Sequence, residues 1–178
     1  MKRRKPARRG KPARTARPAK AKRRVTPIPA GYNSMTPYLI VDGADRAIAF
    51  YKAAFGARAT VRMAHGGKVG HAELKIGDSN VMLADEWPDH QARGPRHYGG
   101  SPVTLLLYVK NVDATVTRAV AAGGTLTRPV QNQFYGDRSG TVEDPFGHVW
   151  HIATHVEDVP PKELKRRAAA AFQESKAG

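Results

Sequence analysis

The sequence contains no cysteine, which excludes disulfides, thiolate-bound metals and cysteine nucleophiles. It also has no apolar run near the roughly 20 residues that cross a membrane. Its basic N-terminus lacks the apolar stretch that a signal peptide requires. These absences predict a cytoplasmic protein without membrane contact, and 178 residues suffice for one domain with a sizeable core plus tails.

Acidic residues are missing from residues 1–24, which nevertheless hold 13 of the 30 Lys and Arg. The rest of the chain carries 17 basic and 15 acidic side chains, so most of the net charge of +15 belongs to this basic arm. Pro6, Pro12 and Pro18 recur every six residues and interrupt any helix, while Ala and Pro offer no core. We therefore expect residues 1–24 to be disordered.

The basic arm resembles in composition the Lys/Pro/Ala tails of linker histones and some bacterial nucleoid proteins. This resemblance implies sequence-independent binding of nucleic-acid phosphates, and association with the nucleoid. A merely solubilising extension is the alternative. The cationic residues concerned are Lys2, Arg3, Arg4, Lys5, Arg8, Arg9, Lys11, Arg14, Arg17, Lys20, Lys22, Arg23 and Arg24.

An internal repeat organises the residues after the arm and its Pro- and Gly-rich linker, which together span residues 1–33. The runs TPYLIV and TLLLYV begin 68 residues apart and have the composition of strands. Each precedes a segment with helical spacing of apolar residues and then three short strand patterns. The first unit has strands at 36–41, 59–63, 70–76 and 80–85 and a helix at 45–55; the second has strands at 104–109, 125–128, 139–143 and 149–154 and a helix at 111–122.

Two βαβββ modules, 34–87 and 101–158, thus make up one domain over residues 34–158. Neither module can bury its sheet face alone, so we predict an α+β fold in which they pair and curl into one cup-shaped mixed sheet. Residues 86–100, rich in Pro, Gly and His, form a lid or crossover between them. Residues 159–178 are predicted to be a C-terminal helix and tail that begins at Pro160-Pro161.

The last hairpin carries the most specific motifs, FYGDRSG at 134–140 and DPFGHVWHIATHVED at 144–158. DPFG places Asp, Pro and Gly at the preferred positions of a type I turn. Together the motifs resemble the closing hairpin of the vicinal oxygen chelate superfamily, which includes glyoxalase I, extradiol dioxygenases and the fosfomycin- and bleomycin-resistance proteins. They are most similar to its PhnB-like branch. The resemblance covers roughly residues 34–158 and implies the duplicated βαβββ fold.

Metal-dependent members of that superfamily hold a divalent cation with one side chain from the first and one from the last strand of each half. The resemblance places these positions at Thr36, Leu83, Thr104 and His151. Leucine has no donor atom and threonine hydroxyls are poor ligands for the metals concerned. We therefore expect no inherited metal and no cofactor, with a metal recruited in another geometry as the alternative.

Strand alternation predicts which side chains line the cup. Apolar Ala72, Leu74 and Ile76 should face the helices, which leaves His71 and Glu73 inside. With the 68-residue offset extended to the last strands, Leu83 and His151 both point into the cup, and Asp85 with them. The predicted ligand-binding residues are Tyr38, His71, Glu73, Tyr108, Tyr135, Arg138, Glu143 and His151, with Glu73, His71 and His151 as candidate catalytic residues.

Other roles remain open for several of these residues. Glu73 is also compatible with a pair with Lys75 on a solvated strand. Asp137 and Arg138 either clamp a ligand at the rim or pair with each other. The first hypothesis is a metal-free small-molecule-binding protein like the bleomycin-resistance proteins, which form homodimers that share cup walls. The alternative is a glyoxalase- or isomerase-like lyase, or a dioxygenase-type enzyme, with a divalent metal and His/Glu acid–base residues. A third hypothesis places the function in the basic arm.

Overall fold

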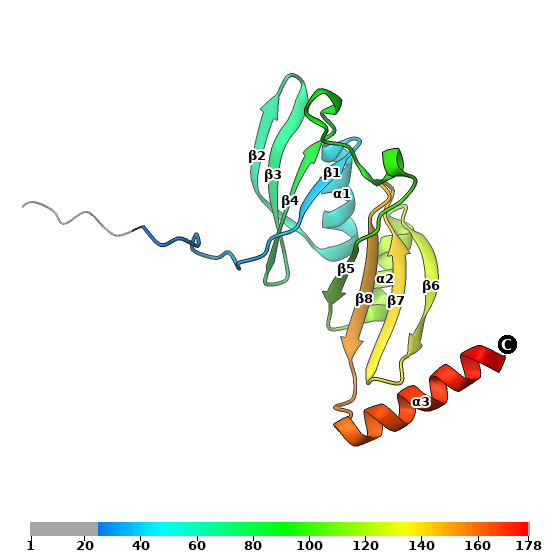
Figure 1. The fold of residues 1–178 in the computed structure, drawn as a ribbon. Coiled ribbons are helices and arrows are strands. Elements are labelled where there is room, and N and C mark those ends of the chain that lie inside the picture. Colours follow the sequence, from blue (N-terminus) through cyan, green and yellow to red (C-terminus); the bar gives the residue numbers. More distant parts are fainter. Residues whose placement is uncertain (1–24, 178) are drawn as a thin grey trace, which may run out of the picture.

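The computed structural model of the chain describes residues 25–177 (Figure 1). The prediction of disorder for the basic arm lies outside these residues. The first module contains five elements: β1 (Tyr38–Val41), α1 (Ala44–Phe55), β2 (Arg58–His65), β3 (Lys68–Ile76) and β4 (Ser79–Asp85). Its four strands form one sheet in the order β1-β4-β3-β2, in which β1 runs parallel to β4 and the other pairs are antiparallel.

The second module repeats this plan. It contains β5 (Thr104–Tyr108), α2 (Val112–Ala121), β6 (Thr125–Asn132), β7 (Asp137–Glu143) and β8 (Val149–His155), with the sheet order β5-β8-β7-β6. Two short 3₁₀ turns, η1 (Pro88–His90) and η2 (Pro95–Tyr98), lie in the connection between the modules, and α3 (Pro161–Ala177) follows the domain. The duplicated βαβββ fold predicted from the sequence is confirmed.

The two modules meet through their helices. The helices lie behind the sheets in Figure 1, and α1 packs against α2. Tyr51 and Phe55 of α1 reach Trp150 of β8, with ring centroids 5.4 and 4.7 Å away. We expected the modules to curl into one cup-shaped mixed sheet, but β1 and β5 are not hydrogen-bonded and the strands form two separate sheets. Each sheet therefore has one face covered by helices and one open face.

The DPFG turn joins the modules through a buried carboxylate. Asp144 is 2 % exposed and accepts hydrogen bonds from the backbone N–H groups of Phe146 and His148. Its other oxygen accepts from the Tyr51 hydroxyl at 2.7 Å and the Trp150 indole N–H at 3.0 Å. The aspartate that starts the turn thus also anchors α1 of the other module.

A one-residue difference between the two modules corrects the predicted face of Leu83 and Asp85. Lys75 pairs with Asn80 across four intervening residues, whereas Glu143 pairs with Val149 across five, because the second turn is longer. Side chains alternate between the two faces of a strand. Because of the extra residue, positions 68 apart in β4 and β8 therefore point to opposite faces of their sheets.

Leu83 is therefore fully buried against the helices, and Met82 is the counterpart of His151. Met82 pairs with Glu73 as His151 pairs with Thr141. Asp85 accepts hydrogen bonds from the backbone N–H groups of Gly43 and Ala44 at the start of α1, on the helix side. Its role is to cap that helix, not to line the cup.

Candidate functional site

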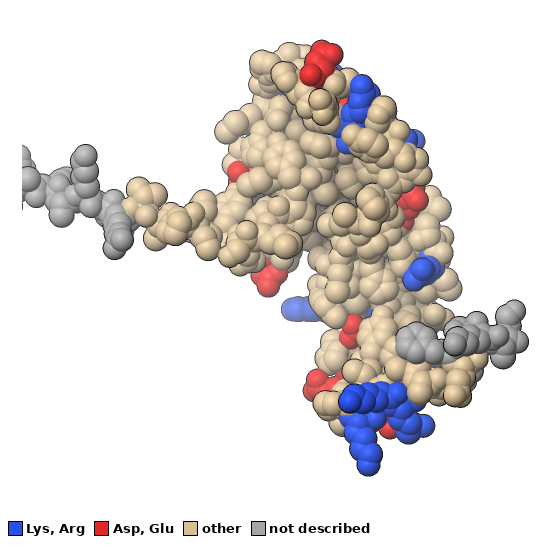
Figure 2. Space-filling view, in the orientation of Figure 1, with Lys and Arg blue, Asp and Glu red and all other residues tan. Residues whose placement is uncertain are grey.

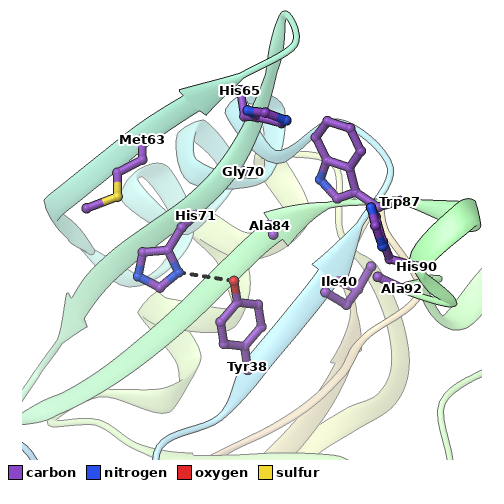
Figure 3. Close-up of a pocket in the computed structure, with 10 residues that line it drawn as sticks. All are labelled: Tyr38, Ile40, Met63, His65, Gly70, His71, Ala84, Trp87, His90 and Ala92. Atoms are coloured by element: carbon purple, nitrogen blue, oxygen red, sulfur yellow. Dashed lines mark hydrogen bonds between the residues drawn. The ribbon is translucent and has the colours of Figure 1, made fainter.

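A cavity of about 580 Å³ lies on the open face of the first sheet, between β1, β3 and the connection that follows β4 (Figure 3). Its walls are mainly apolar and aromatic, with three imidazoles among them. The side chains that shape it are Tyr38, Met63, His65, His71, Trp87 and His90. A volume of this size is in the range of pockets that bind small molecules.

A chain of hydrogen bonds starts at Tyr38 and His71 in the cavity wall and continues to Glu73, which lies outside the lining. The Tyr38 hydroxyl lies 3.0 Å from Nδ1 of His71, and Nε2 of His71 lies 3.2 Å from Oε1 of Glu73. The other Glu73 oxygen accepts a hydrogen bond from the hydroxyl of Tyr32. The bond from Tyr32, and then that from His71, lower the pKa of Glu73, so the carboxylate is ionised at neutral pH. Partial burial raises the pKa of Tyr38.

Trp87 forms one wall of the cavity and is held from two sides. The ammonium of Lys68 lies 5.3 Å from the centre of its ring, and the ring of His65 is 5.4 Å away. Backbone hydrogen bonds between Trp87 and Ala92 close the loop that carries His90. The predicted lid region therefore has ordered structure that completes one side of the cavity, as Figure 3 shows.

The open face of the second sheet carries a different polar cluster. Asp137, only 5 % exposed, accepts from the Tyr108 hydroxyl at 2.8 Å and contacts Nδ1 of His155 at 2.8 Å. Nε2 of His155 lies 3.0 Å from Asp158. The hydrogen bond to Asp137 raises the pKa of Tyr108, and the bonds to Asp158 and then Asp137 raise the pKa of His155. Farther along β8, His151 lies 3.1 Å from the Thr141 hydroxyl.

The structure thus divides the predicted pocket residues between two faces. It brings Tyr38, His71 and Glu73 together on the first sheet, as strand alternation predicted. Tyr108 and His151 belong to the second sheet and do not line the 580 Å³ cavity. Glu73 contacts His71 but is not itself a lining residue, and Tyr135, Arg138 and Glu143 are also absent from the cavity walls.

Arg138 faces α2, where its guanidinium forms two hydrogen bonds with Asp113 at 2.7 and 2.8 Å. The pairing with Asp137 that the sequence analysis considered is therefore not the one formed. Tyr135 lies beside His155 in a shallow surface hollow, and Glu143 lies next to Gly147 at the opposite end of the sheet. The alternative pairing of Glu73 with Lys75 is also replaced, because Lys75 donates to the backbone oxygen of Asp78.

The residues at the family's metal positions do not fit a divalent cation. Thr36 and Thr104 line a second cavity of about 410 Å³ near the junction of β1 and β5. Neither His151 nor its counterpart Met82 lines that cavity, and Leu83 is buried on the helix side. Within residues 25–177, no three His, Asp or Glu side chains converge as a metal site would require.

Two residues of the site were missed by sequence reasoning. Tyr32 was assigned to the linker, yet its hydroxyl reaches Glu73, and the backbone oxygen of neighbouring Gly31 accepts a hydrogen bond from Asn80 at 2.6 Å. Trp87 was placed in the connecting loop without a role. A solitary tryptophan in a polar loop was the available signal, since a large apolar side chain there needs a surface to cover.

Comparison with known proteins gives a consistent result. Residues 31–152 match the model of the family described as the glyoxalase/bleomycin resistance protein/dioxygenase superfamily. An uncharacterised protein of Mycobacterium bovis is 40 % identical over 136 residues, which cover 74 % of this chain and 90 % of that protein. An uncharacterised protein of Mycobacterium tuberculosis is also 40 % identical over 136 residues, with 74 % and 80 % covered.

Solved structures show the same arrangement. TioX from Micromonospora sp. ML1 is 27 % identical, with a TM-score of 0.55 over 70 % of this chain and 99 % of that one. A gene product from Arabidopsis thaliana is 30 % identical, with a TM-score of 0.55 over 68 % of this chain and 98 % of that one. A PhnB protein from Bacillus cereus, 18 % identical with a TM-score of 0.55 over 68 % of this chain and 99 % of that one, shares the fold.

Proposed function

The chain belongs to the glyoxalase/bleomycin resistance protein/dioxygenase superfamily, and from this premise we propose that it is a small-molecule-binding protein of the PhnB-like branch that acts without a metal. The observation that carries the proposal is the 580 Å³ cavity on the first sheet. Apolar walls with a few convergent polar groups are typical of ligand sites. Assignment to the branch rests on the FYGDRSG and DPFGHVW motifs.

The lining predicts the class of ligand. Trp87 and Met63 offer flat and polarisable apolar contacts, and His65 and His90 add imidazole rings at the rim. Tyr38 supplies the hydroxyl on the floor. A planar, mainly apolar molecule with one polar group satisfies these walls, because it buries aromatic surface while leaving no floor group unpaired.

Trp87 also provides the test. The other tryptophan, Trp150, is 2 % exposed in the core, so Trp87 is the tryptophan that a ligand in the cavity contacts. We expect 8-anilinonaphthalene-1-sulfonate, a planar apolar probe, to bind with a dissociation constant in the micromolar range and to quench Trp87. Trp87→Ala should weaken binding about tenfold or more, whereas Tyr98→Phe, outside the cavity, should not. Equal binding by wild type and Trp87→Ala would remove the cavity as the binding site.

A homodimer is the second part of the proposal, as in the bleomycin-resistance proteins. The open faces carry exposed apolar side chains, including Tyr38 at 48 %, Leu106 at 56 % and Tyr108 at 58 % exposure. Figure 2, which views the molecule from this side, shows mainly uncharged residues over both sheets. Uncharged, apolar surface of this kind favours association, so a partner's sheet would close the cavity.

Sedimentation velocity tests the dimer. At micromolar concentration we expect the wild type to sediment as a dimer and Leu106→Lys, on the open face of β5, as a monomer. Val120→Lys is the matched control, because Val120 is 42 % exposed on α2, away from the open faces. A monomeric wild type, or dissociation by the control alone, contradicts this arrangement.

A further inference from the structure

The order of the hydrogen-bonded groups, Tyr38, His71 and Glu73, determines which ring nitrogen of His71 carries a proton. Both oxygens of Glu73 accept hydrogen bonds, from Tyr32 and from His71. An ionised carboxylate can only accept, so Nε2 of His71 carries the proton that points to Glu73. When the ring carries only this proton, Nδ1 has a lone pair to which the Tyr38 hydroxyl, 3.0 Å away, donates.

We propose that Tyr38, His71 and Glu73 form a proton relay that removes an acidic C–H or O–H proton from a molecule bound in the cavity. The relay rests on the binding site proposed above and adds a reaction to it. Tyr38 touches the substrate, because it lines the cavity and is half exposed. As its oxygen takes the substrate proton, its own proton passes to Nδ1 of His71, and the imidazolium formed is stabilised by Glu73.

In the second module a tyrosine bonds a carboxylate with no imidazole between them. Tyr108 is the last residue of β5, at the position that Ile40 holds in β1, and its hydroxyl donates directly to Asp137 at 2.8 Å. The adjacent carboxylate raises the pKa of Tyr108 and is itself a weak base, so this phenol keeps its proton. Only the first module places an imidazole between tyrosine and carboxylate, with 25 % of the His71 side chain exposed.

A purely structural role for these hydrogen bonds predicts a different outcome. In that case Glu73 serves to hold the segment around Tyr32 against the sheet. Tyr32→Phe would then be the most damaging substitution, and Tyr38 would matter little. In the relay, Tyr38 and His71 are essential to the reaction, whereas Tyr32 only supports Glu73.

Elimination of 5-nitrobenzisoxazole is a suitable probe, since it is planar, fits a cavity of this volume and needs only a base. The base takes the proton from C3, the C–H electron pair forms the nitrile, and the N–O bond breaks to give a coloured phenolate. We expect Tyr38→Phe and His71→Asn to lower kcat by about tenfold or more with KM changed by less than about twofold, and Glu73→Gln to act in the same direction. Tyr98→Phe and His97→Gln, neighbouring phenol and imidazole outside the cavity, should leave the rate unchanged.

Two measurements separate the relay from the binding site. Binding of 8-anilinonaphthalene-1-sulfonate by all variants, with equal elimination rates in wild type, Tyr38→Phe and His71→Asn, overturns the relay alone. If the wild type does not bind 8-anilinonaphthalene-1-sulfonate, both the binding site and the relay are overturned. Nitrogen-15 NMR of the histidine rings gives an independent readout: we expect an unprotonated Nδ1 and a protonated Nε2 in His71, and loss of this fixed tautomer in Glu73→Gln. A protonated Nδ1 in the wild type also overturns the relay.

Discussion

Asp144 combines two roles in one side chain, since it shapes the DPFG turn and accepts hydrogen bonds from the core of the other module. Four donors surround its carboxylate, two from the turn backbone and two from the side chains of Tyr51 and Trp150. Burial of Tyr51, together with the charge of Asp144 and the hydrogen bond to it, raises the pKa of Tyr51 well above its ordinary value. The Tyr51 hydroxyl therefore keeps its proton and remains a donor. The turn motif is therefore also a packing motif.

Replacement of this carboxylate should be costly. In Asp144→Asn an amide N–H₂ replaces one carboxylate oxygen and cannot accept the hydrogen bonds that this oxygen accepts. We expect a loss of about 2–3 kcal/mol in the free energy of unfolding. Urea denaturation measures it. Asp78→Asn, in the corresponding exposed turn of the first module, is the control and should cost less than about 0.5 kcal/mol. Equal effects in the two turns would contradict the bridging role.

Gly136 in the FYGD motif is a second position where the local structure depends on a single residue, because a Cβ atom does not fit there. Its φ is +99°, and a Cβ there would lie 2.1 Å from the backbone oxygen of Glu157. Its own carbonyl accepts hydrogen bonds from the N–H groups of Val156 and Glu157. The glycine therefore allows the chain after β8 to pack on the turn before β7.

We expect Gly136→Ala to destabilise the domain by about 3 kcal/mol, through backbone strain and this overlap. Gly77→Ala is the control, because Gly77 has a φ of +57° but open space around its Cβ position. It should cost only about 1–2 kcal/mol, the price of the left-handed backbone alone. Chemical denaturation of both variants gives the comparison, and an equal cost would show that the contact with Glu157 is unimportant.

At the scale of elements, the junction between β8 and α3 depends on a histidine. His155 contacts both Asp137 and Asp158, which raise its pKa. The charged imidazolium is thus favoured in the folded state. Its contribution to stability is fully present below the unfolded pKa of about 6.5 and is lost as the pH rises through the higher folded value.

Hydrogen exchange of the Val156 and Glu157 amides should report this change, since both bond to Gly136. We expect their protection to fall as the pH rises above about 6.5 and through the higher folded pKa of His155, after correction for the intrinsic exchange rate. His155→Gln should remove the dependence, whereas His97→Gln should retain it. A flat profile in the wild type would contradict the role of the imidazolium.

The elements also show how far sequence reasoning reached. The repeated pattern of apolar residues predicted every strand and helix of both modules, because the apolar residues of each element face the core between sheet and helices. It failed at the last hairpin. The turn before Val149 is one residue longer than its counterpart, so the 68-residue offset wrongly equated Leu83 with His151 and assigned Leu83 to the cup. Periodicity fixes which residues share a face but not the equivalence of two faces across turns of different length. Tyr32 was unpredictable for another reason, because its contact with Glu73 spans 41 residues and has no local pattern.

At the scale of the whole molecule, the arm and the domain differ in net charge. Outside residues 1–24 the chain carries 17 basic and 15 acidic side chains, and some of the basic ones pair within α3, where Glu163 contacts Arg166 and Arg167. Those contacts lower the pKa of Glu163 to about 2. No helix among residues 25–177 is long and apolar enough to cross a membrane. Nucleic acid is the polyanion that we propose as the partner of the arm.

The arm's binding should follow counterion release, whose magnitude is independent of base sequence. With about half of its 13 cations on phosphates, the slope of log K against log salt should be roughly −5 to −6, at about −0.9 per contact. Affinity should be micromolar at best in physiological salt and equal for different duplexes, because contacts to phosphates carry no information about base sequence. Salt titrations of duplex binding by the full chain and by a shortened chain starting at Val25 measure both quantities. We expect the shortened chain to lose nearly all binding, since the domain is almost neutral; equal affinities, or a slope near zero, would show that the arm does not tether the protein to nucleic acid.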